Sequence, residues 1–140
     1  MGKDINNFHT ILIISKNSEM SMTWETLFKQ RNCYAISETS PENAVQSAVL
    51  IAPSLIILDL DLPQTEKLDL CRDLRSATNG ALLLLSPRGN EQNIFEYSHA
   101  GVDEYIATPI SPLALLIISM AWLVKKEWNI PRSQSVQAHI

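Results

Sequence analysis

The stretch Leu55-Ile56-Ile57-Leu58-Asp59-Leu60-Asp61-Leu62-Pro63 decides the fold of this chain. Its first four residues are apolar without alternation, which is typical of a strand buried on both faces in the middle of a parallel sheet. The run ends abruptly in the two acidic residues Asp59 and Asp61. Because ligands and chemistry gather at the carboxyl ends of parallel strands, these carboxylates are the first candidate site residues.

Two further runs are also apolar without alternation, namely Ile11 to Ile14 and Ala81 to Leu85. Weaker strand candidates cover residues 33–37 and 103–107. Between the strands lie helical patterns, which cover residues 18–30, 41 onward after a Ser40-Pro41-Glu42 start, 66–76, 91–100 and 112–127. Five strands alternating with five helices predict an α/β fold, a doubly wound five-stranded parallel sheet with right-handed crossovers.

Length and composition narrow the class of protein. The 140 residues are 46% hydrophobic and 19% charged, so the chain can form one domain with a packed core. We place that domain at residues 8–127 and a tail or linker at 128–140. A net charge of −4 argues against nucleic-acid binding by bulk electrostatics. Two cysteines make no disulfide framework, and no apolar run is long enough for a membrane span, so we expect a cytoplasmic protein.

Four segments resemble the receiver domain of bacterial two-component response regulators, the CheY-like family. The segments occur in the family's order and spacing within residues 10–126, and they are residues 55–63, 68–75, 85–89 and 101–109. The resemblance implies a flavodoxin-like sheet with strand order 2-1-3-4-5. It also implies a role in two-component or phosphorelay signalling, with a histidine kinase, another signalling protein or an output domain as partner.

The resemblance implies specific roles for the residues at the strand ends. Asp59 falls at the phosphoacceptor position, Ser86 at the hydroxyl switch position and Tyr105 at the aromatic switch position. A cis peptide is expected at Thr108-Pro109. In the family, a divalent cation is held by two acids after the first strand, by the acceptor, and by a backbone carbonyl two residues beyond it. A lysine after the fifth strand pairs with the phosphoryl group.

This chain departs from that pattern at both charged positions. Ser15 and Lys16 replace the acidic pair, and Thr108 replaces the lysine. Mg²⁺ prefers carboxylate oxygens, so we expect weak or absent binding of this metal and impaired phosphorylation of Asp59. Asp61 is a possible second oxygen ligand in this loop. For Lys16, two interpretations stay open, a solvated side chain or an ammonium paired with Asp59; Arg88 is either a second such cation or solvent-facing.

The last helix is apolar almost all round from Leu113 to Val124. A helix packed on one face of a sheet needs a single apolar stripe, so the far side is expected to be covered. We predict an interface, either a homodimer or a partner contact, and the alternative is a tail that folds back over the helix. The predicted interface residues are Leu113, Leu116, Met120 and Trp122.

These observations favour an atypical receiver domain, a pseudo-receiver that acts mainly by protein–protein contact and is not an enzyme. The first alternative is a functional receiver that a histidine kinase phosphorylates on Asp59. The second is a flavodoxin-like enzyme or cofactor binder, although Ser15-Lys16-Asn17-Ser18-Glu19 contains no glycine and therefore no glycine-rich phosphate loop. No resident cofactor, membrane contact or direct nucleic-acid contact is expected.

Overall fold

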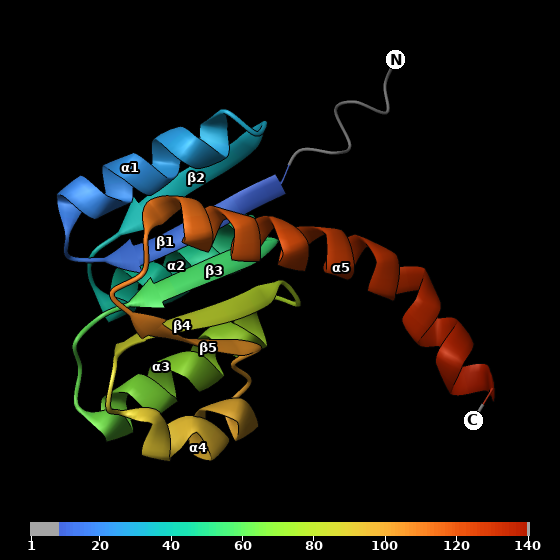
Figure 1. Cartoon of the computed structure of the whole chain (residues 1–140). Coiled ribbons are helices and arrows are strands. Elements are labelled where there is room, and N and C mark those ends of the chain that lie inside the picture. Colours follow the sequence, from blue (N-terminus) through green and yellow to red (C-terminus); the bar gives the residue numbers. More distant parts are fainter. Residues whose placement is uncertain (1–8, 140) are drawn as a thin grey trace.

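Five parallel strands form the centre of the molecule (Figure 1). The computed structural model describes residues 9–139, with side chains described for 9–90 and 92–125. The sheet has the order β2-β1-β3-β4-β5, which confirms the predicted topology. The strands are β1 (His9–Ser15), β2 (Cys33–Glu38), β3 (Leu55–Asp59), β4 (Ala81–Pro87) and β5 (Glu104–Thr108).

The sheet has helices on both faces, and their bounds are α1 (Ser18–Lys29), α2 (Pro41–Ile51), α3 (Gln64–Ala77), α4 (Ile94–His99) and α5 (Pro112–His139). The prediction of one helix from residue 91 to 100 is corrected. Glu91–Asn93 forms a short 3-10 turn, η2, and α4 begins only at Ile94, the first apolar residue of the segment. The polar residues before it have no apolar side chain with which to anchor an α-helix to the sheet.

The last helix continues beyond its predicted end at residue 127, because α5 reaches His139. The charged residues Lys125, Lys126 and Glu127 suggested an end there, but lysine and glutamate are good helix formers and do not stop a helix. The side chains of residues 126–139 lie outside the described part, so the tail or linker role of residues 128–140 stays a prediction.

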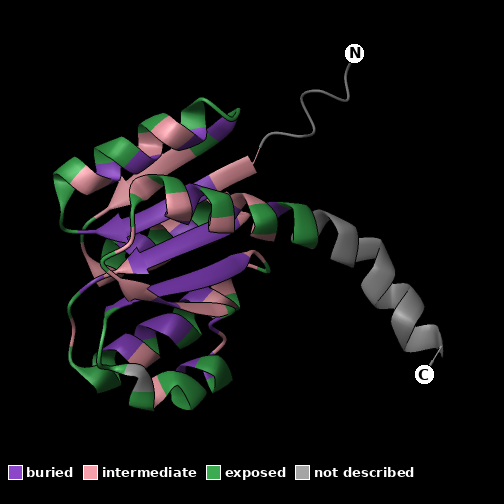
Figure 2. Cartoon of the chain, in the orientation of Figure 1, coloured by how far each residue is buried: buried purple, intermediate pink, exposed green. Residues whose placement is uncertain are grey.

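Two apolar layers hold the sheet between the helices (Figure 2). Alternate residues of the central strands point into opposite layers. Leu12 and Ile56 pack with α2, α3 and α4, whereas Ile11 and Ile57 pack with α1 and α5. Both faces of β1 and β3 are therefore buried, which explains why their sequences lack alternation. No described helix has the length and apolar character needed to cross a membrane.

The predicted interface on α5 needs correction. Leu116 is only 3% exposed and packs in the core with Leu115 and Leu123. Met120 and Trp122 are half-buried and pack against the same layer. Because only one side of α5 faces the sheet, its outer side carries a different set of apolar residues, namely Leu113, Ile117 and Val124. Of the predicted interface residues, Leu113 alone is exposed.

Candidate functional site

A cleft lies at the carboxyl edge of the sheet, where β3, β4 and the start of α3 meet. It has a volume of about 380 Å³. The parallel register brings the strand ends together here, with Ser15 opposite Asp59 and Pro87 opposite Thr108. The ionisable and hydroxyl side chains that the cleft lining offers for chemistry include those of Asp59, Asp61, Lys67, Ser86 and Thr108. The sequence predicted four of these five residues.

Asp59 is the last residue of β3 and is half-buried. Ser15 Oγ donates a hydrogen bond to Asp59 Oδ2 at 3.4 Å. Burial raises the pKa of the Asp59 carboxyl above its ordinary value, while the Ser15 hydrogen bond and the positive charge of Lys67 act in the opposite direction. Loss of water around the carboxylate is therefore the dominant influence on this acid.

Lys67 is the functional candidate that the sequence analysis missed. It lies in the first two turns of α3, is only 7% exposed and lines the Asp59 cleft. Polar helix residues usually face solvent, and the sequence pattern alone predicts an inward face of Leu68, Cys71 and Leu74 for this helix. The buried set is instead Lys67, Leu70, Cys71 and Leu74. This spacing of i, i+3, i+4 and i+7 was present in the sequence and marks Lys67 as part of the inward stripe.

The two cations proposed from sequence do not pair with Asp59. Lys16 and Arg88 are both exposed, and among the described side chains neither forms an ion pair. The interpretation that Lys16 pairs with Asp59 is therefore wrong for this structure. Lys16 follows the end of β1 in the turn before α1, where its long side chain reaches water without obstruction.

The two residues predicted as switch positions, Ser86 and Tyr105, lie on the neighbouring strands β4 and β5. Ser86 is 3% exposed and forms part of the cleft lining at the end of β4. Tyr105 is half-buried, and its hydroxyl donates to the Asn90 carbonyl at 2.9 Å. The Tyr105 ring also packs at 6.0 Å from that of Tyr97. The Thr108–Pro109 peptide is cis, as predicted.

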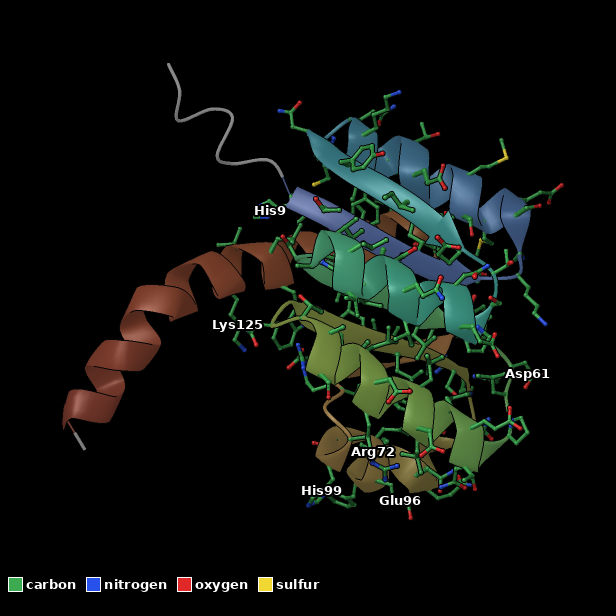
Figure 3. The ribbon with its side chains drawn as sticks, turned by 180° about the vertical axis from the view of Figure 1, so that it is seen from behind. His9, Asp61, Arg72, Glu96, His99 and Lys125 are labelled. Carbon is green, nitrogen blue, oxygen red and sulfur yellow. The ribbon has the colours of Figure 1, made fainter. Side chains whose placement is uncertain are left out.

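A divalent cation does not fit the side chains of this cleft well. Among the described side chains, Asp59 and Asp61 are the only carboxylates in its lining, and Asp61 is exposed in the loop after β3 (Figure 3). The lining also contains a lysine. Among the described residues, no three His, Cys, Asp or Glu side chains form a group that could hold a metal ion. Mg²⁺ requires several oxygen ligands in a near-octahedral arrangement.

None of the described histidines lines this cleft. Figure 3 shows His9 and His99 far from Asp61, at the start of β1 and the end of α4. His139 lies outside the described side chains. The two cysteines, Cys33 and Cys71, are free and buried, which raises the pKa of Cys71 to about 12. Neither thiol therefore supplies a thiolate near neutral pH.

A family model for the response regulator receiver domain matches residues 11–118. The chain belongs to this family. The transcriptional regulatory protein ResD of Bacillus subtilis is 28% identical to this receiver domain over 115 residues, which cover 81% of the chain and 48% of ResD. The aerobic respiration control protein ArcA of Escherichia coli is 30% identical over 107 residues, which cover 76% of the chain and 45% of ArcA. The receiver domain thus spans about half the length of the curated relatives it matches.

Solved structures agree on the fold. A two-component response regulator from Clostridium difficile superimposes with a TM-score of 0.74 at 18% identity, covering 85% of this chain and 98% of that one. The receiver domain of the sensor histidine kinase PA1611 from Pseudomonas aeruginosa has a TM-score of 0.67 at 21% identity, covering 82% and 97%. That protein has a magnesium ion coordinated in its active site cleft. At these identities the likeness concerns the fold alone.

Proposed function

We propose that this receiver domain is an atypical signalling module of the cytoplasm, whose Mg²⁺-dependent phosphorylation is impaired and which acts mainly through protein–protein contact. The observation that carries the proposal is the composition of the Asp59 cleft. Its lining combines the acceptor carboxylate with the buried Lys67, and Ser15 and Thr108 stand at positions where phosphoryl transfer in the family uses charged side chains. Phosphoryl transfer depends on positive charge that neutralises the attacking carboxylate and the phosphoryl oxygens.

Contact with a partner is supported by the outer side of α5. Leu113 is 57% exposed, Ile117 is 62% exposed and Val124 is 47% exposed. Exposed apolar side chains in this number favour a protein interface, because their contact with water is unfavourable. We propose that this side of α5 binds a histidine kinase, another signalling protein, an output domain or a second copy of the chain.

A functional phosphoacceptor is the second candidate, and the surroundings of Asp59 favour it. The carboxylate ends a central strand, the buried Ser86 hydroxyl lines the same cleft, and the Thr108–Pro109 peptide is cis. This candidate requires a cation site built from Asp59 and Asp61. The family membership of the chain favours either signalling role over an enzyme or a cofactor binder.

Phosphorylation of the protein distinguishes the two candidates. The protein is incubated with phosphoramidate and Mg²⁺, and its intact mass is measured in parallel with that of Asp59→Asn. We expect no mass gain in either protein. A gain of one phosphoryl group in the parent that disappears in Asp59→Asn contradicts the first proposal and establishes the second.

A further inference from the structure

Lys67 occupies an unusual position for a lysine in two respects. Only 7% of the residue is exposed, so the aliphatic part of its side chain packs against the protein. It is also the fourth residue of α3, close to the positive end of the helix dipole, which disfavours a cation. Negative charge in its surroundings would offset this disadvantage.

That compensation does not come from a direct ion pair. Within the described part of the chain, Lys67 forms no salt bridge and no side-chain hydrogen bond. Its ammonium shares the Asp59 cleft, however, and its positive charge acts on the Asp59 carboxylate. Among the described side chains, Asp59 and Asp61 are the two acidic residues in that lining. The negative charges of Asp59 and Asp61 in the cleft therefore stabilise the ammonium, without a direct hydrogen bond or ion pair.

We infer that the Lys67 ammonium is the built-in cation of the Asp59 cleft and takes the electrostatic place of a divalent metal ion. A monovalent cation fixed by α3 offsets part of the negative charge of Asp59 without a coordination shell. A divalent ion that approached Asp59 would meet this ammonium across the same cleft, and like charges repel one another. This inference deepens the proposed function, because it names the residue that makes the site metal-independent.

Exclusion of the metal by Lys67 can be distinguished from a lack of acidic ligands. Replacement of Lys16 by aspartate supplies an additional carboxylate at the acidic-pair position. If ligands were all that is missing, Lys16→Asp would strengthen metal binding, and removal of the Lys67 charge would add nothing further. If Lys67 excludes the metal, Lys16→Asp stays weak until Lys67 is also neutralised. Methionine is the suitable replacement at residue 67, because it retains most of the apolar length of lysine and tolerates a buried position.

The experiment measures binding of Mn²⁺ by electron paramagnetic resonance of the free ion. Four proteins are compared: the parent, Lys16→Asp, Lys16→Asp/Lys67→Met and the charge-matched control Lys16→Asp/Lys29→Met. Lys29 is exposed in the last turn of α1, whereas Lys16 lies just before the first turn of the same helix. The control therefore changes the net charge by the same amount at the other end of α1. Thermal unfolding of each protein establishes that it is folded.

We expect Lys16→Asp/Lys67→Met to bind Mn²⁺ at least about tenfold more tightly than either Lys16→Asp or the Lys29 control, which corresponds to about 1.4 kcal/mol. Equal affinities in all three folded variants would overturn the inference. So would tight binding by the parent. Failure of this inference leaves the proposed function testable on its own, because phosphorylation is measured by mass on the unmodified parent chain.

Discussion

Ser15 and Asp59 are register partners at the carboxyl ends of β1 and β3, and Ser15 Oγ donates to Asp59 Oδ2 at 3.4 Å. Ser15 also accepts a hydrogen bond from the Asn17 amide at 3.1 Å, and Asn17 in turn caps α1 through its contact with Met20. The Asp59 carboxylate is thereby connected to the start of α1 by neutral groups. An acidic residue at Ser15 would instead place a second negative charge next to Asp59.

Removal of the Ser15 hydroxyl tests this connection. Ser15→Ala takes away the hydrogen bond that favours the charged carboxylate, so the pKa of Asp59 is expected to rise further above its ordinary value. The pKa is measured by carbon-13 NMR titration of the side-chain carboxyl. Ser86→Ala is the matched control, since it removes a buried hydroxyl of the same cleft. A pKa that falls or stays unchanged in Ser15→Ala refutes the assigned role of Ser15.

Asp59→Asn is expected to stabilise the domain at neutral pH. The raised pKa means that folding favours the protonated form of Asp59, so the charged form costs stability, and this cost appears as the pH rises through the ordinary and then the folded pKa. Asparagine has no such cost. The melting temperature of Asp59→Asn should exceed that of the parent at pH 7, and the difference should vanish near or below pH 3.8, the ordinary pKa of the acid. A variant that is less stable than the parent at pH 7 would contradict the assigned dominance of burial.

Most of the fold could be predicted from the sequence, because a strand that is buried on both faces appears as an uninterrupted apolar run. The runs from Ile11 and Leu55 are apolar on both faces, and both became central strands. The cis peptide before Pro109 followed from the family resemblance. Lys67 was missed because a lysine is ordinarily solvated, and its burial depends on tertiary packing of α3 against the sheet.

The α5 interface was misplaced for a related physical reason. When nearly every residue of a helix is apolar, the sequence contains no contrast between its two sides, and the rotation of the helix on the sheet cannot be deduced. Leu116 and Ile117 are adjacent and equally apolar, yet they are 3% and 62% exposed. The distinction comes from the rotation of α5 on the sheet, which tertiary packing against the layer of Leu115 and Leu123 defines.

Leu116 and Ile117 provide a matched pair for testing the outer side of α5. Leu116→Glu buries a charge in the core and is expected to cost more than about 3 kcal/mol, which unfolds most or all of a marginally stable domain. Ile117→Glu is expected to stay folded and to weaken self-association or partner binding. Circular dichroism and light scattering measure these outcomes. A folded Leu116→Glu or an unfolded Ile117→Glu would refute the orientation of α5.

Arg75 is expected to be the arginine of α3 that matters for stability. Its guanidinium donates to the carbonyls of Gly101, Thr78 and Gly80 and forms an ion pair with Asp103 at 3.1 Å. Arg75→Met should cost about 2–4 kcal/mol, because several partly buried acceptors lose their donor. Arg72→Met is the control: its pair with Asp69 is exposed and is worth less than about 0.5 kcal/mol. Urea unfolding measures both, and equal losses would contradict this assignment.

The most direct measurement of the central claim is a crystal structure of the unmodified protein soaked in MnCl₂, with anomalous scattering recorded for manganese. We expect the Lys67 ammonium to lie in the Asp59 cleft and no anomalous peak to lie within bonding distance of the Asp59 carboxylate. An anomalous peak bound to Asp59, with the Lys67 side chain displaced from the cleft, would contradict it.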